Sequence, residues 1–265
     1  MRVQRIGPLL VLLTLFPLAI SPGYGQESGD SAARQLFLSG RQSSVVGGFG
    51  GAKGAPGEPP ARPAAPAAPK PTNLGLGYTL LLRVDRDNFV HASSKRIFKN
   101  GEAIRLLVES SSDGYLYVFH KEGGGPARMI FPSWKVEQGK NRILAHIPLP
   151  VPAGAELVFG DNPGTETLTL LVLLRPIEGL PTGEGLRGKN NITIPDELFQ
   201  RLSKPTQLRK DERVPEGTPA TNDDGKSGRS PGIKLRTYDE APDYIVLNHD
   251  PIETRLVVAV QVTHK

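Results

Sequence analysis

AIRLLVESSSDGYLYVFHKE, residues 103–122, is the stretch that decides the fold. Residues 103–109 and 115–120 are rich in β-branched, aromatic and leucine side chains, and Asp113-Gly114 lies between them. An Asp-Gly pair between two such runs is a strong signal for a reversal between antiparallel strands. Residues 115–120 are apolar at successive positions, which predicts a central strand that is buried on both faces.

Short apolar runs separated by turn residues continue on both sides of this stretch. Glycine and proline cluster between the runs, at residues 123–126 and 161–164. Further strands are predicted at residues 79–84, 127–131, 142–147, 156–159 and 166–174. Runs of this length and spacing, with no helical periodicity between them, predict an all-β fold: a single antiparallel Ig-like β-sandwich.

The C-terminal segments are also rich in strand-forming residues. Residues 244–247 and 254–262 have strong β character, and the second run is too apolar to lie exposed. We therefore expect residues 251–265 to return to the sandwich, whose core is residues 74–176, and to complete it with a last strand. Residues 177–250 are then an insertion.

One short helix is predicted, within this insertion, at residues 195–202 (PDELFQRL). Proline suits the first turn of a helix, and Asp196 and Glu197 suit its positive N-terminal end. The later apolar residues of the segment share one helical face. Residues 203–243 are polar and charged, so we expect them to form a long flexible excursion.

Residues 26–73 precede the sandwich and include the low-complexity segment GGFGGAKGAPGEPPARPAAPAAPKPT at 47–72. Such a segment cannot bury enough apolar surface to offset its ordering entropy. We expect residues 26–73 to be a disordered Gly/Pro/Ala-rich segment. It is either a spacer that holds the domain away from the N-terminus or a tail without that role.

Residues 1–25 read as a secretory signal peptide. Arg2 and Arg5 form a positive start, residues 6–20 are mostly apolar, and small residues precede Gln26. This arrangement predicts cleavage before Gln26. The apolar run is shorter than the ~20 residues that span a bilayer, so we expect no stable transmembrane segment after cleavage. A retained N-terminal anchor is the alternative.

The composition excludes several classes of function. The chain has no cysteine, which excludes a thiol nucleophile and a cysteine-ligated metal. An exported chain without cysteine also fits a bacterial periplasmic or extracellular location better than animal secretion. The net charge of +5 is not gathered into a basic stripe, so nucleic acid is not an expected partner. The five histidines are dispersed, so we predict neither a metal nor another cofactor.

Two glycine-containing motifs resemble catalytic sites but lack their mechanics. Residues 228–232 (GRSPG) fit a serine-hydrolase elbow, but Pro231 has no N–H to offer to an oxyanion. Residues 183–188 (GEGLRG) fit a phosphate loop, which must open directly into a helix, and no helix is predicted at that point. We therefore predict no catalytic residues.

The aromatic residues of the central strand allow two interpretations. Tyr115, Tyr117 and Phe119 alternate and so share one face of the strand. Tyr115 and Tyr117, together with Trp134 in the following loop, would form a platform for a sugar. Alternatively, these rings are part of the sandwich core, which we favour because the strand is expected to be central.

The central segment resembles a known bacterial family over about residues 95–176. The matching pieces are GYLYVFHKEGGGPARMIFPS, Asn141-Arg142-Ile143, IPLPVPAGAELVF and GTETLTLLVLLRP, in that order. Together they resemble the domain-of-unknown-function 4384 family (DUF4384). The resemblance implies an exported β-sandwich module without catalytic residues of its own, which other proteins attach to peptidase-like or kinase-like domains.

The functional expectation is a non-enzymatic exported envelope module. It would bind a partner protein or a cell-wall component through its loops or an exposed sheet edge. A carbohydrate-binding module that uses the aromatic platform is the alternative. An enzyme remains a third possibility, and it would need a concave pocket lined by carboxylates or histidines from distant parts of the chain.

Overall fold

β4 (Ala103–Ser110) and β5 (Gly114–Glu122) flank the Asp113-Gly114 reversal, and they lie in different sheets. The reversal is therefore an arch between two sheets, not the turn of a hairpin as we expected. Glycine suits this arch because a Cβ at Gly114 would lie 2.6 Å from the carbonyl oxygen of Leu173 in the neighbouring strand.

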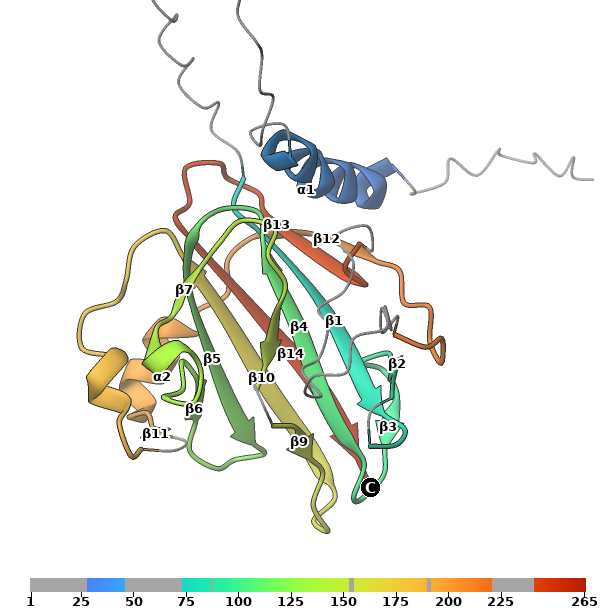
Figure 1. Ribbon diagram of the computed structural model, residues 1–265, viewed down its shortest axis with the longest axis vertical. Coiled ribbons are helices and arrows are strands. Elements are labelled where there is room, and N and C mark those ends of the chain that lie inside the picture. Colours follow the sequence, from blue (N-terminus) through green and yellow to red (C-terminus); the bar gives the residue numbers. More distant parts are fainter. Residues whose placement is uncertain (1–27, 46–72, 87, 153–154, 190–191, 221–240) are drawn as a thin grey trace, which may run out of the picture.

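The computed structural model describes residues 28–45, 73–86, 88–152, 155–189, 192–220 and 241–265, and its two sheets pack together (Figure 1). The first sheet has the order β12-β13-β1-β4-β8, with β2 paired to β1 and β9 paired to β4. Its other strands are β1 (Gly75–Arg83), β2 (Phe89–His91), β8 (Leu149–Val151), β9 (Leu157–Val158), β12 (Leu208–Glu212) and β13 (Tyr244–Asn248).

The second sheet has the order β11-β6-β5-β10-β14-β3, with β7 paired to β5. Its other strands are β3 (Ile97–Phe98), β6 (Arg128–Phe131), β7 (Arg142–Ile143), β10 (Gly164–Leu173), β11 (Ile192–Thr193) and β14 (Arg255–His264). The pair of β3 with β14 is parallel. A mostly β, sandwich-like fold is thus confirmed, whereas the Ig-like topology is not.

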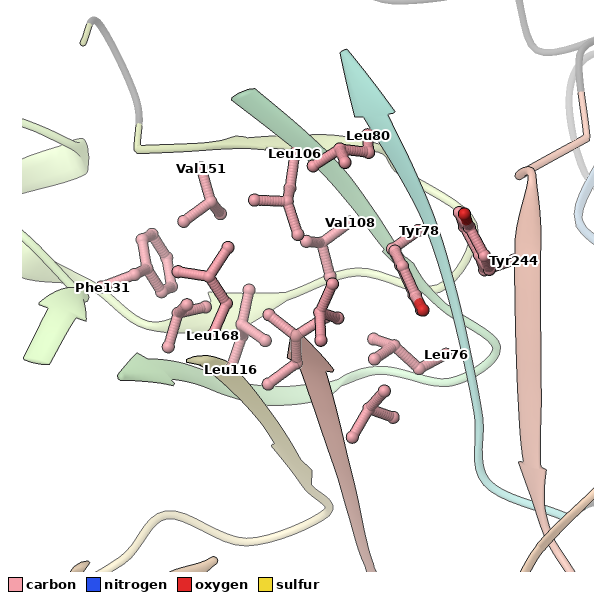
Figure 2. Packing of buried hydrophobic residues seen from close by; sticks show 14 of the residues in the cluster. Leu76, Tyr78, Leu80, Leu106, Val108, Leu116, Phe131, Val151, Leu168 and Tyr244 are labelled. Atoms are coloured by element: carbon pink, nitrogen blue, oxygen red, sulfur yellow. The ribbon is translucent and has the colours of Figure 1, made fainter. Parts of the chain in front are cut away.

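The inner core lies between the two sheets and follows from the period-2 alternation of strand side chains. Leu76, Tyr78 and Leu80 point inward from β1, and Leu116 and Leu168 meet them from the second sheet (Figure 2). The Tyr78 and Tyr244 rings stack at 4.6 Å between centroids. Full burial of each large aliphatic side chain contributes about 1.5–3 kcal/mol.

The outer face of the second sheet is covered by the segment that follows β10. Tyr117 and Phe119 point outward from β5 and pack against Phe199 and Leu202. Those two residues belong to α2 (Asp196–Leu202), which confirms the predicted short helix. The predicted core role of the aromatics therefore needs a correction: they build a second core on the outer face, because Leu116 and Val118 occupy the inner one.

A helix that we did not predict packs on part of the outer face of the first sheet. α1 (Ser28–Val45) lies within residues 26–73, which we expected to be disordered, and it packs along β12 and β13 (Figure 1). Its Ala33 and Phe37 are buried against Ile245 and Leu247. Residues 46–72 lie outside the described part of the chain.

Buried ion pairs hold α1 in place. Arg34 Nε donates to Asp211 Oδ1 at 2.5 Å, and its Nη1 donates to the Pro242 carbonyl oxygen at 3.0 Å. Arg41 Nε donates to Glu109 Oε1 at 2.8 Å. These partners are far away in sequence, so local composition does not reveal that residues 28–45 have a docking surface.

Residues 177–250 are more than an insertion, because they supply strands to both sheets. β11 pairs with β6, and β12 and β13 extend the first sheet beyond β1. The predicted flexible excursion, residues 203–243, contains β12, and residues 221–240 of it lie outside the described part. At the C-terminus, β14 pairs with β10 along its whole length, from Gly164↔His264 to Leu173↔Arg255.

Candidate binding groove at the open end of the sandwich

A groove lies at one end of the sandwich, between β9 at the edge of the first sheet and the facing strands of the second sheet. It consists of two hollows of about 380 and 350 Å³ that share His120, Glu122, Leu157 and Val158. In Figure 1, β9 and the loop after it lie near the ends of β5 and β10, at the bottom of the view. We call this feature the open-end groove.

The first hollow contains a cluster of two histidines and one carboxylate. His120 Nε2 lies 2.6 Å from Glu166 Oε2, and His264 Nε2 lies 3.2 Å from Glu166 Oε1. The register explains the cluster, because β5, β10 and β14 are neighbours and all three residues are on the inner face. On β10 the inner core ends at Leu168, the partner of His120, and the inward-facing side chain two residues before Leu168 on that strand is Glu166.

His264 has a second nitrogen for which the described residues provide no partner. Its ring is buried and stacks on Phe159 at 5.1 Å between centroids. Nδ1 of this ring is buried without a hydrogen bond. A buried polar nitrogen without a hydrogen-bond partner costs free energy.

The charges of the open-end groove are separated along its length. The first hollow is lined by Glu122 and Glu166 and has no lysine or arginine in its wall. The second hollow is lined by Arg128, Lys135 and Lys189 in addition to Glu122 and Glu156. Glu156 is already held by arginines outside the groove, at 2.8 Å by Arg83 and at 3.1 Å by Arg105. Glu122 lines both hollows and lies 3.9 Å from Arg128, so the two hollows differ by Glu166 in the first and by Lys135 and Lys189 in the second.

The histidine–carboxylate cluster is not arranged as a metal site. The two imidazoles contact different oxygens of the same Glu166 carboxylate, which lies between them. In the described part of the chain, no group of three or more histidine, aspartate or glutamate residues is placed to hold a metal ion. The Glu166 carboxylate instead orients the His120 ring by a hydrogen bond, as a carboxylate commonly does for histidine, and lies within ion-pair distance of the His264 ring.

The cluster was not predicted, because the spacing of the histidines along the sequence does not show which of them become neighbours in the fold. His120 and His264 are far apart in sequence and meet only because β10 lies between β5 and β14. A weak signal was present: both residues stand at the polar end of a long apolar run in the sequence.

The predicted aromatic platform does not present an exposed surface. Tyr117 is fully buried, and its hydroxyl accepts a hydrogen bond from the Ile177 N–H at 3.4 Å. Burial raises the pKa of the Tyr117 hydroxyl. Tyr115 and Trp134 are half-buried against the same outer core, and the Arg187 guanidinium lies 5.5 Å from the Trp134 ring centroid.

Of the two motifs that resemble catalytic sites, the structure describes only residues 183–188, whose Leu186 lines the second hollow of the groove. Gly183–Leu186 forms a short 3-10 turn whose Leu186 is buried in the outer core, and the next element is β11 rather than a helix. This geometry does not match a phosphate loop. Residues 228–232 lie outside the described residues.

Fold and groove together define a class: a two-sheet, sandwich-like domain with both outer faces covered and a polar groove at its open end. Residues 97–176 match a family model described as Domain of unknown function (DUF4384). This stretch of the chain is therefore a DUF4384 domain, which confirms the resemblance found in the sequence. No curated protein and no solved structure matches the chain significantly.

The matched stretch covers β3 to β10 and supplies most of the open-end groove. His120, Glu166 and Val158 lie inside it, whereas His264 and Lys189 lie outside. None of the described helices is long and apolar enough to cross a membrane.

Proposed function

We propose that the protein is a non-enzymatic exported envelope module that binds a partner protein or a cell-wall component in the open-end groove. One observation carries this proposal. The chain's own α1 and α2 segments pack on the outer faces of the two sheets, whereas the groove keeps polar groups of both charges in reach of solvent.

Binding without catalysis is supported by how the groove histidines are used. His120 and His264 both direct Nε2 to Glu166. Among the described residues, no serine or threonine hydroxyl is hydrogen-bonded to either ring. Nucleophilic catalysis requires a nucleophile within hydrogen-bond reach of its base.

Export is part of the proposal and is supported by the signal-like residues 1–25 and by the absence of cysteine. We expect the mature chain, purified from a bacterial host, to begin at Gln26. Mass spectrometry of the N-terminus measures this, and a chain that still begins at Met1 would indicate an anchored form instead.

Affinity capture from envelope fractions tests the binding role. Val158→Asp places a charge on the exposed rim of the groove, and Ile252→Asp makes the same change at an exposed position in the turn before β14. We expect the wild-type chain and Ile252→Asp to retain the same envelope component and Val158→Asp to lose it. Retention of nothing by the wild type, or equal retention by both variants, contradicts the proposal.

The structure does not favour a carbohydrate-binding platform as a second candidate function. Its central residue, Tyr117, is fully buried. The lining of the open-end groove contains no phenylalanine, tyrosine or tryptophan on which a sugar ring would stack.

A further inference from the structure

Val158 lies on the rim between the two hollows of the open-end groove and is 60% exposed. β9 pairs with β4 on one side only, with Val158 opposite Ala103. The next residue, Phe159, bonds back to this side, since its N–H donates to the Glu102 carbonyl oxygen at 3.0 Å. Backbone groups alternate in direction along an antiparallel strand, so the N–H and C=O of Val158 point away from β4.

At this edge of the first sheet, β9 can accept a further strand, whereas the neighbouring β8 cannot do so readily. β8, which lies beside β9 along the same edge of β4, contains Pro150 and is followed by Pro152. Neither proline has an N–H, and proline is a usual means of protecting a sheet edge. An incoming strand therefore finds a donor and an acceptor on the same residue at Val158.

The charges on the two sides of Val158 define what such a strand must carry. Glu166 lies in the hollow reached after β9, where residues 160–166 form the wall, and Glu122 lies where this hollow meets the other one. Lys135 and Lys189 lie in the hollow reached before β9, and both are exposed and without an ion pair among the described residues. A ligand that spans Val158 meets negative charge on one side and positive charge on the other.

We propose that the open-end groove binds an extended peptide with a basic group N-terminal to an acidic group. The peptide pairs antiparallel with Val158, as β9 itself pairs with β4. In this direction its lysine, arginine or amino terminus lies beside Glu122 and Glu166. Its aspartate, glutamate or carboxyl terminus lies beside Lys135 and Lys189.

This peptide assignment rests on the proposed binding function, and it identifies the ligand as a segment of a protein. A peptide backbone satisfies the free N–H and C=O of Val158, and opposite charges at its two ends satisfy both hollows. A neutral glycan offers no charge to either hollow and finds no phenylalanine, tyrosine or tryptophan ring in the lining.

Selection from a displayed library of random short peptides on the full mature chain tests the proposal. We expect enrichment of sequences with Lys or Arg before Asp or Glu, and no such enrichment on Val158→Asp. The labelled probe Lys-Val-Thr-Val-Glu, measured by fluorescence anisotropy, should bind about tenfold or more tightly than Glu-Val-Thr-Val-Lys, because the reversed peptide places like charges together.

Matched charge variants sharpen this test. Glu122→Gln and Lys135→Gln should each weaken binding of the probe, and Glu216→Gln and Lys204→Gln, at exposed positions outside the groove, should leave it unchanged. The double variant Glu122→Lys with Lys189→Glu should reverse the preference between the two peptides. Circular dichroism melts verify that each variant is folded.

The outcomes separate the ligand assignment from the proposed function. If an envelope component is retained through Val158 but the library shows no charge order, the peptide assignment is wrong and the binding function stands. The same conclusion follows if a purified cell-wall polymer, but not the peptides, displaces the retained envelope component. If neither envelope retention nor peptide enrichment depends on Val158, both proposals fail.

Discussion

Glu109 is a buried carboxylate on the outer face of the first sheet, and its partners stabilise the charge. Its carboxylate accepts hydrogen bonds from Arg41 of α1 and lies 3.1 Å from His146 Nδ1. Burial by itself raises the pKa of Glu109, but these two hydrogen bonds and the nearby positive charge of Arg41 outweigh it and hold the pKa below its ordinary value.

This lowered pKa predicts a pH dependence of stability. Because the folded-state pKa lies below the ordinary value of 4.5, the stabilisation is complete above that pH and is lost as the pH falls through the folded-state pKa. Glu109→Gln should cost about 2 kcal/mol at neutral pH and should flatten the loss at acidic pH. Urea unfolding at a series of pH values measures both. Parallel curves for the variant and the wild type would exclude this role.

Gly114 gives a second prediction at the residue scale. A Cβ at this position would meet the Leu173 carbonyl oxygen at 2.6 Å, and backbone atoms cannot rotate away. Gly114→Ala should therefore destabilise the fold by about 1–3 kcal/mol, as overpacking does elsewhere. Gly124→Ala is the control, because nothing lies within 4 Å of its Cβ position. Equal melting temperatures for the two variants would contradict the close approach of β5 and β10.

α1 is the element in which the structure differs most from the fold predicted from the sequence. Most of the stability of a helix within a protein comes from the packing of its apolar face rather than from helix propensity, so we expect docking to stabilise α1. Phe37 is fully buried and lies where Gly75 and Gly77 leave room, since a Cβ at either glycine would come within 3.1 Å of its ring. The composition of residues 26–73 predicted disorder because it does not reveal the docking surface, which is formed by strands outside this segment.

Phe37→Ala should release this helix. We expect a loss of about 3 kcal/mol of docking free energy, because a buried aromatic ring is removed. Limited proteolysis and hydrogen exchange over α1 should then rise, while the sandwich keeps its cooperative unfolding. Leu36→Ala, at a neighbouring exposed position of α1, should change neither. Protection of α1 that survives in Phe37→Ala would show that the ion pairs alone are sufficient.

The whole molecule is larger than the family domain within it. The inner core takes Leu76 and Leu80 from β1, Val246 from β13 and Val258 from β14, all outside residues 97–176. Each buried side chain contributes about 1.5–3 kcal/mol, and the net stability of a domain is only about 5–15 kcal/mol. The matched segment therefore depends on strands from both ends of the chain.

Expression of two fragments tests this dependence. A fragment of residues 97–176 should lack cooperative thermal unfolding by circular dichroism. A fragment of residues 73–265, which contains all the strands of both sheets, should unfold cooperatively. A well-dispersed spectrum by nuclear magnetic resonance for the shorter fragment would mean that β1, β13 and β14 are dispensable.

The sequence by itself determined the kind of element at most positions. Strand alternation and turn residues depend on near neighbours in the chain, which is why β4, β5, β10, β13, β14 and α2 were predicted close to their observed places. The family resemblance has the same local origin, because it lies within one continuous stretch.

Only the tertiary structure decided which strands became neighbours, and the function proposed here depends on those neighbours. The arch at Gly114 sends β4 and β5 to different sheets, although the Asp-Gly pair predicted a hairpin. Arg34 meets Asp211 across 177 positions of sequence, and Glu166 joins His120 to His264 only because β10 lies between their strands. Such contacts are set by the packing of the whole chain against one core, a property that no local pattern contains.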